Sequence, residues 1–263
     1  YLLGPTEAAA KVYKGAHCPG NIPVRKFEIS AINVEVTLNQ WGDYYPGYMY
    51  ALDKDIDKVR DEEKRNLVAR KKKDGLDPGA VSTGLQGDAI QPMTIRGNQG
   101  DCVRVKFTNQ LEDEDAGFQI SGSAMIISSS GQPDTAATPG AIVASGESQT
   151  YEWFIPIDQQ EGSHMIQNHA GRDPSALGLI GAFIVEPRGS IYLDPFTGGP
   201  LENGWMAMIA NDDARDFREF ALFYHEIGDE SFRPLNRHGE MIPQRDPLTD
   251  AYRPSARAMN FRS

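Results

Sequence analysis

Most apolar stretches of this chain alternate between apolar and polar positions, the pattern of a strand with one face against a core. The longest spans positions 24 to 38. Phe27 and Ile29 occupy odd positions in it, whereas the later apolar residues occupy even positions, namely Ile32, Val34, Val36 and Leu38. This change of parity near Ser30 and Ala31 predicts either a bulge or a strand that passes from one sheet to another.

Shorter alternating stretches follow at regular intervals along the chain. The apolar members of two of them are Val103, Val105 and Phe107, and Tyr151, Trp153 and Ile155. Positions 182 to 185 form a continuous apolar run, typical of a strand buried on both faces. Gly, Pro, Asn and Asp bound these segments, as in the short strands and turns of a β-sandwich or barrel. The pattern therefore predicts an all-β fold.

One segment breaks this pattern. Between Leu52 and Lys73 the chain is dense in charged residues, and a few positions recur at helical spacing, namely Leu52, Ile56, Val59, Glu63 and Leu67. We therefore expect a charged helix inserted into the β fold, ending at the turn sequences 74–75 and 77–79. Its lysines and arginines form either a basic docking face or, as we prefer, a solvated surface.

Turn-forming residues mark the limits of the domain. Positions 128 to 140 are small and polar and predict a loop. Beyond Pro187, the sequences Asp-Pro, Gly-Gly-Pro and Asn-Gly predict a linker, which we place at 191–216. A new strand is expected from Phe217 to Tyr224.

Composition narrows the class of protein. The chain has 263 residues, 40% of them apolar and 24% charged, which is enough to bury a core. Its net charge of −11 argues against nucleic-acid binding, because that needs clustered Lys and Arg. No apolar run reaches the roughly 20 residues of a membrane span. The chain begins with Tyr1 and without a signal-peptide pattern, which a processed secreted protein, a cleaved fragment or an omitted leader would each explain.

The two cysteines, Cys18 and Cys102, are too few for a thiolate cluster and lack the spacing of a metal site. They form either a disulfide that fixes the N-terminal arm to a strand, which we prefer, or two free buried thiols. The disulfide would imply an oxidising compartment.

Two acidic clusters offer oxygen ligands for a hard cation such as Ca²⁺ or Mn²⁺. They are the segment 112–115 and the group Asn211, Asp212, Asp213 and Asp216. Neither has the spacing of a defined metal-binding loop, so we interpret both as solvated acidic loops. The chain also lacks a phosphate-binding glycine loop, a Gly-x-Ser-x-Gly elbow and a His-Glu-x-x-His motif, so those enzyme classes have no support.

Several short motifs occur in a fixed order along the middle of the chain. They are Ile95 to Val105, Asn109-Gln110-Leu111, Pro139 to Ser148, Tyr151-Glu152-Trp153, Glu161 to His164 and Gly178 to Pro187. In this order they resemble the first cupredoxin domain of a large bacterial multicopper oxidase. The resemblance implies a cupredoxin-like Greek-key β-sandwich at 24–190, preceded by an N-terminal arm at 1–23. Residues 217–263 resemble the first strand and extension of a second such domain, completed on another polypeptide or on sequence absent from this chain.

The resemblance also locates copper ligands, because a first domain of this family is expected to carry two His-x-His pairs for a three-copper cluster. Imidazole suits both oxidation states of copper, and such a pair places both rings on one face of a strand. Ser121 and Ser123 stand at the place of the first pair, and Gln167 and His169 at that of the second. We therefore interpret Ser121, Ser123 and Gln167 as degenerate ligand positions.

The remaining histidines give weaker support for copper. His164 lies five positions before His169, so the two would point to opposite faces of a regular strand. They are candidate metal ligands only on an irregular backbone, and we favour packing or hydrogen-bonding roles. His17 precedes Cys18, whereas the family's electron-entry copper would need the reverse order near the end of a domain.

These observations favour a catalytically degenerate cupredoxin-like domain that serves structure and assembly in a secreted multicopper oxidase-like protein. A second hypothesis is an active oxidase of metal ions or phenols, with copper bound mainly by partner domains. A third is a purely structural surface or filament subunit. The expected partners are other cupredoxin-like domains or chains of the same protein, and the expected location is extracellular or periplasmic. Copper is a candidate cofactor of the complete assembly, with none held by this chain alone.

Overall fold

A computed structural model describes residues 17–72, 87–128, 142–227, 232–246, 248–252 and 256–261. Most of the loop expected at 128–140 lies outside these residues, and so do the turns expected to end the charged helix. None of the described helices is long and apolar enough to cross a membrane.

Strands dominate the described chain. They are β1 (Val24–Thr37), β2 (Tyr44–Leu52), β3 (Met93–Asn98), β4 (Cys102–Asn109), β5 (Ala116–Gly117), β6 (Gln119–Ile120), β7 (Ile126–Ile127), β8 (Ile142–Val143), β9 (Ser148–Phe154), β10 (Gly162–Gln167), β11 (Ile180–Glu186), β12 (Ile191–Leu193), β13 (Met206–Ala210), β14 (Phe217–Phe220), β15 (Tyr224–Ile227) and β16 (Ala256–Met259). The helical elements are a 3-10 turn (Asp53–Asp55), α1 (Ile56–Arg70) and the short α2 (Arg172–Ala176). The all-β prediction with one substantial inserted helix is confirmed.

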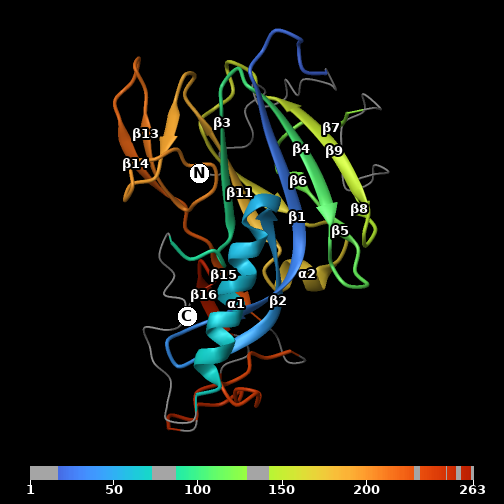
Figure 1. The fold of residues 1–263 in the computed structure, drawn as a ribbon, viewed down its shortest axis with the longest axis vertical. Coiled ribbons are helices and arrows are strands. Elements are labelled where there is room, and N and C mark those ends of the chain that lie inside the picture. Colours follow the sequence, from blue (N-terminus) through green and yellow to red (C-terminus); the bar gives the residue numbers. More distant parts are fainter. Residues whose placement is uncertain are drawn as a thin grey trace, which may run out of the picture.

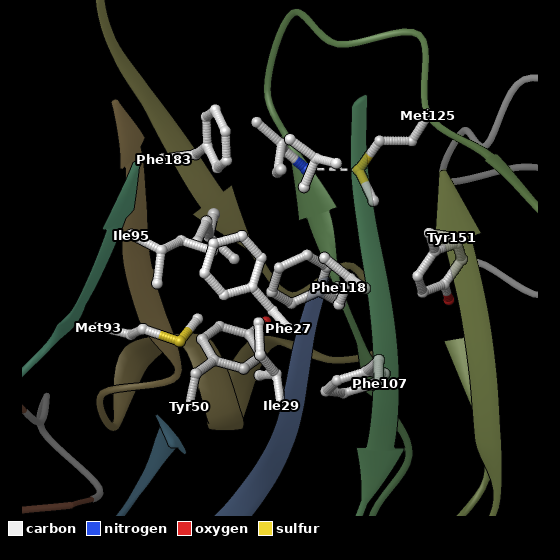
Figure 2. Packing of buried hydrophobic residues seen from close by; sticks show 14 of the residues in the cluster. Phe27, Ile29, Tyr50, Met93, Ile95, Phe107, Phe118, Met125, Tyr151 and Phe183 are labelled. Carbon is white, nitrogen blue, oxygen red and sulfur yellow. Dashed lines mark hydrogen bonds between the residues drawn. The ribbon is translucent and has the colours of Figure 1, made fainter. Parts of the chain in front are cut away.

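Two sheets form a sandwich (Figure 1). One has the strand order β2-β1-β4-β9-β7 and the other β3-β11-β10-β6, with parallel pairing between β1 and β4 and between β3 and β11. Inward-facing side chains of both sheets meet in a core that Figure 2 shows from close by, with Phe107, Phe118 and Phe183 among its members. The alternation that predicts these strands places every second side chain in that core.

Strand β1 serves two cores, one on each face. Its odd positions Phe27, Ile29 and Ala31 belong to the sandwich core. Its later even positions Ile32, Val34 and Val36, with Leu38 just after the strand, belong to a second cluster that also contains Ile227 and Phe261. Pairing with β2 runs without interruption through this region, so the change of parity reflects a change of burial partner and needs no bulge.

Helix α1 begins later than expected and packs through a different face. Leu52 ends β2, and Leu67 is 38% exposed although it belongs to the predicted apolar series. The buried face instead contains Val59 with Glu62, Asn66, Ala69 and Arg70. The helix docks mainly through polar contacts, which an apolar periodicity does not detect.

Two of these polar contacts explain the docking. The Glu62 carboxylate accepts hydrogen bonds from the backbone N–H groups of Ala89 and Ile90, the latter at 3.2 Å. Arg70 pairs with Glu35, and its guanidinium carbon lies 3.9 Å from the centre of the Tyr44 ring. Each buried charged group therefore has a partner, as burial requires.

The segment expected as a linker, 191–216, contains β12 and β13. They form a separate three-stranded sheet with β14, in which β13 is the central strand. The single strand expected from Phe217 to Tyr224 is two strands, because β14 ends at Phe220 and β15 pairs with β16 in another sheet. The apolar run at 206–209 is short and lies between turn sequences, so the sequence pattern did not predict the strand β13 there.

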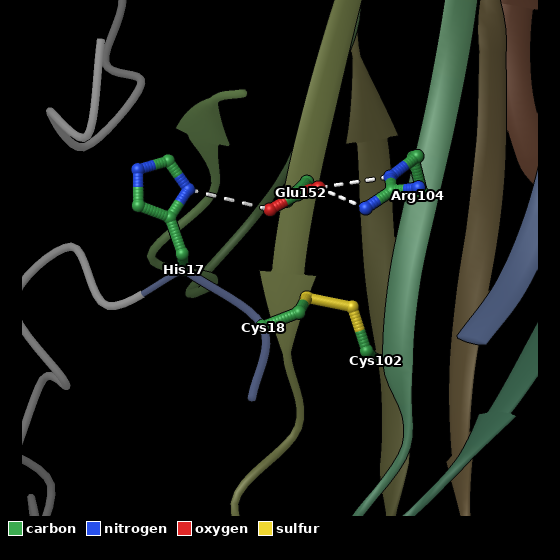
Figure 3. The surroundings of a disulfide bond; sticks show 5 residues. All are labelled: His17, Cys18, Cys102, Arg104 and Glu152. Carbon is green, nitrogen blue, oxygen red and sulfur yellow. Dashed lines mark hydrogen bonds and ion pairs between the residues drawn. A yellow bond between two sulfur atoms is a disulfide. The ribbon is translucent and has the colours of Figure 1, made fainter. Parts of the chain in front are cut away.

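A disulfide joins Cys18 to Cys102 at the start of β4, with their Cα atoms 5.8 Å apart (Figure 3). The predicted disulfide is thus present, and it ties the end of the N-terminal arm to the sandwich. The neighbouring His17 Nδ1 lies 3.5 Å from a carboxylate oxygen of Glu152, which also pairs with Arg104.

Candidate metal centre

The edge formed by β6 and β10 contains the predicted copper-ligand positions. Ile120 pairs with Ile166, and Gln119 with Gln167. Directly after β6, the Ser121 N–H donates to the Met165 carbonyl at 2.8 Å, and the Met165 N–H donates to Ser121 Oγ at 2.9 Å. The places at which the family would carry its two His-x-His pairs are therefore adjacent in space.

Both serine hydroxyls at this edge already have backbone partners. Ser121 Oγ accepts the Met165 N–H, and Ser123 Oγ donates to the Ile120 carbonyl at 2.6 Å. The Ser123 bond closes the turn after β6, and the Ser121 bond joins this turn to β10. The Gln167 side chain bonds to another side chain on its own strand, because its Nε2 donates to Met165 Sδ at 3.2 Å. The three side chains are neutral and serve local structure.

His164 contacts the interior of the sandwich. It lies on the same face of β10 as Ile166, whose side chain is fully buried, because the two are separated by two positions. Its ring lies edge-on to Trp153, with centroids 5.7 Å apart, and its Nδ1 lies 2.8 Å from the Ser121 carbonyl. This is the environment of a packing and hydrogen-bonding histidine.

His169 follows the end of β10 and is exposed. It lines a cavity of about 750 Å³ together with Met165, Asn168, Tyr224 and His225. His164 does not line this cavity. The structure therefore separates the two histidines that we considered as a metal pair and brings His169 toward His225 instead.

Sequence reasoning missed His225, and no local motif marks it. Its ring lies edge-on to Phe261, with centroids 5.4 Å apart, and its Nε2 is buried with no hydrogen-bond partner. Burial lowers the pKa of His225 to about 4, so the imidazole is neutral at neutral pH. Although a neutral imidazole is the form that binds metal, this Nε2 is shielded from the cavity.

These residues do not fit a copper cluster. Such a cluster needs several imidazoles, whereas this edge offers His169 with one amide and two hydroxyls that have backbone partners. Within the described residues, no group of three or more His, Cys, Asp or Glu side chains is placed to hold a metal ion.

The acidic group at 211–216 is accounted for by its turn. Asn211 Oδ1 accepts the Asp213 N–H at 2.9 Å, and Asp216 Oδ1 accepts the Asn211 N–H at 3.2 Å. The Asn211 amide also donates to the Arg188 carbonyl at 3.0 Å. These bonds close the turn between β13 and β14, as Asx residues commonly do.

Comparison with known proteins shows what part of the chain is similar to. Residues 76–190 match the family model described as multicopper oxidase. This part of the chain is therefore similar to the multicopper oxidases. A 110-residue stretch is 34% identical to L-ascorbate oxidase of Cucumis sativus and covers 41% of this chain and 17% of that protein. The matched stretch therefore spans a minor part of the length of this relative.

Two solved structures align with most of this chain and with about half of their own. A multi-copper oxidase from Pseudomonas thermotolerans aligns with 92% of this chain and 42% of its own, at 16% identity and a TM-score of 0.46. The blue copper oxidase of Nitrosomonas europaea aligns with 91% of this chain and 54% of its own, at 13% identity and a TM-score of 0.43. The β-sandwich itself is given by the two sheets of this chain, and the similarity to multicopper oxidases is given by residues 76–190.

Proposed function

We propose that this chain is a degenerate cupredoxin-like domain that provides structure and assembly contacts in a larger multicopper oxidase-like protein and holds no complete copper site of its own. The observation that carries this proposal is the edge between β6 and β10. Ser121 and Ser123 bond to backbone there, and of the four expected ligand positions only 169 holds a histidine. The disulfide between Cys18 and Cys102 supports an extracellular or periplasmic location.

The proposed domain division keeps the sandwich at 24–190 after an N-terminal arm at 1–23. The second cupredoxin-like domain begins at β12 rather than at 217, because β12 pairs with β13 and β13 pairs with β14. The remaining strands of that domain are supplied by further sequence or by another chain.

Metal analysis of the purified chain tests this function. After loading with excess copper and extensive dialysis, we expect far less than one copper ion per chain and no absorption band of a copper oxidase. Stoichiometric copper that is lost in the His169→Gln variant would overturn the proposal. Zinc loading under the same conditions controls for adsorption to the acidic surface.

An active oxidase is the second candidate, and the 34% identity to an ascorbate oxidase favours it. In that case, other domains hold the copper, and this chain lines a substrate or electron path. The cavity lined by His169 and Tyr224 is the candidate for part of that path. Copper would supply one-electron oxidation of substrate and reduction of oxygen. Oxygen uptake by the complete protein, with metal ions and phenols as substrates, separates the two candidates.

A further inference from the structure

Three charged side chains from three strands meet where the β12-β13-β14 sheet contacts the sandwich. Arg96 lies on β3, Glu186 at the end of β11 and Glu219 on β14. Arg96 and Glu186 are each 2% exposed. The cluster is therefore buried at a junction between two sheets, where a charge needs partners to be tolerated.

Arg96 belongs to the sandwich and binds the second sheet and the segment that leads into it. Its Nε donates to Glu219 Oε1 at 2.7 Å, and its Nη2 lies 2.5 Å from the same oxygen. Its Nη1 donates to the Gly204 carbonyl at 3.0 Å, just before β13. One guanidinium thus neutralises one carboxylate and anchors the backbone that leads into the second sheet.

Glu186 adds a second carboxyl group for which no second cation is present in the cluster. A side-chain hydrogen bond joins it to Glu219, and its Oε1 is buried without a partner. Two hydrogen-bonded carboxyl groups share a proton, because two neighbouring buried anions would repel each other. Desolvation, and next the contacts with Glu219, raise the pKa of Glu186 to about 8.

The other groups that face Glu186 do not cancel this effect. The positive charge of Arg96 lowers the pKa of Glu186 and the negative charge of Glu161 raises it, but both act less than burial and Glu219. From β12, the Tyr192 hydroxyl donates to Asn98 Oδ1, and burial raises the pKa of that hydroxyl. Tyr192 is therefore neutral throughout the range in which Glu186 titrates.

We propose that the proton shared by Glu186 and Glu219 is a pH-sensitive latch that holds the β12-β13-β14 sheet against β3 and β11. When the proton is present, the carboxyl pair carries one negative charge, which Arg96 balances. When it is lost, a second negative charge remains buried at the junction. Undocking then becomes easier, because it exposes Glu186 to water.

The neighbouring hydrogen bonds at the junction contribute no pH dependence of their own. The Thr94 N–H donates to Asn203 Oδ1 at 2.8 Å, and the Gly204 N–H donates to the Thr94 carbonyl at 3.1 Å. These bonds involve no titratable group, so they hold the junction equally at every pH. The pH dependence of docking therefore comes from the carboxyl pair.

The direction of the effect follows from linkage. In the undocked state Glu186 has its ordinary pKa of about 4.5, and in the docked state about 8, so the docked state binds more protons between these values. Docking is strongest below about pH 4.5 and weakens by about tenfold per pH unit up to about pH 8. Above that, it changes no further.

Amide hydrogen exchange of the whole chain tests the latch. After correction for the chemical exchange rate, we expect the opening constant of amides in β13 and β14 to rise about tenfold per unit between about pH 5 and about pH 8. In Glu186→Gln, whose amide donates to Glu219 at any pH, the same amides should show no such slope. Wild-type amides without this slope, or a slope that persists in Glu186→Gln, would overturn the latch.

The matched control is Glu202→Gln. Glu202 lies in the segment between β12 and β13 that also contains Gly204. Its side chain is 61% exposed, and its partner is the exposed Lys54. This variant should keep the wild-type slope, and a loss of the slope here would also overturn the proposal. If Glu186→Gln does not fold, infrared spectroscopy of the wild type decides: a protonated carboxyl band must be present at about pH 6 and absent at about pH 10.

Discussion

At the scale of single residues, burial of His225 makes the stability of the fold depend on pH in the acidic range. Its ring packs against Phe261, and burial lowers its pKa to about 4, against about 6.5 in the unfolded chain. The unfolded state therefore binds the proton more readily than the folded state. The stability that this neutral ring contributes is complete above about pH 6.5 and is lost as the pH falls from about 6.5 toward about 4.

The variant His225→Phe should remove this loss, because phenylalanine keeps the edge-on contact with Phe261 and does not titrate. Between about pH 7.5 and about pH 5, we expect the wild type to lose about 2 kcal/mol of unfolding free energy more than the variant does. Urea unfolding at both pH values measures the difference. The exposed His238, replaced by Gln, serves as the control and should behave like the wild type. Equal acid sensitivity of His225→Phe and wild type would contradict the assignment.

The sequence indicates some of these residues and conceals others. Ser121, Ser123 and Gln167 can be located because β6 and β10 follow the family order of motifs. His225 cannot, because its environment depends on Phe261, which reaches it only through pairing of β15 with β16. Long-range contacts of this kind leave no periodic signal along the chain.

At the scale of elements, glycine on β11 permits the close approach of β3. A Cβ atom at Gly181 would lie 2.9 Å from the Met93 carbonyl on the paired strand, closer than side-chain carbon atoms approach backbone oxygen. The Gly181→Ala variant must displace one strand. We expect a loss of about 2 kcal/mol in unfolding free energy, measured by urea denaturation.

A matched control exists at Gly20, where an added Cβ would meet nothing within 4 Å. Gly20→Ala should change stability by less than about 0.5 kcal/mol. If both variants were equally stable, the approach of β3 to β11 would not constrain position 181.

The disulfide links the N-terminal arm to β4 and so stabilises the folded chain. It joins residues separated by 84 positions, and closing a loop of that length restricts the unfolded chain. Reduction should lower the unfolding free energy by about 4 kcal/mol. The measurement is urea unfolding with and without reductant. Cys18→Ser should match the reduced wild type and be insensitive to reductant, and a reductant effect that persists in this variant would point to another cause.

Helix α1 shows why apolar periodicity predicts an element more reliably than its buried face. The spacing of Ile56 and Val59 correctly indicates a helix. The face that packs, however, is fixed by Glu62, which binds backbone N–H groups at 89–90, and by Arg70 beside Tyr44. Buried charged residues look like surface residues in a sequence, because only their distant partners make burial favourable.

At the scale of the whole molecule, the last sheet supports a domain that continues elsewhere. Its own core is small and consists of Tyr192, Ala207 and Ile209, with Leu201 against it. Large apolar side chains on and beside it are 41% to 78% exposed, namely Ile191, Phe196, Phe217, Phe220 and Tyr224. Exposed apolar groups on this scale are typical of surfaces that another segment covers. This agrees with our proposal that further strands complete a second cupredoxin-like domain.

The proposed loss of copper sites predicts that they can be restored. In the triple variant Ser121→His, Ser123→His and Gln167→His, the pairing of β6 with β10 would bring three new imidazoles near His169. We expect the variant to retain at least about one copper ion per chain after dialysis, measured by elemental analysis, whereas the wild type retains none. Adding His169→Gln should lower that content. The lost serine hydrogen bonds should cost about 1 kcal/mol each, so urea unfolding must show that the variant folds. A folded variant without copper would mean that the backbone of this edge, as well as its side chains, has departed from the geometry that copper requires.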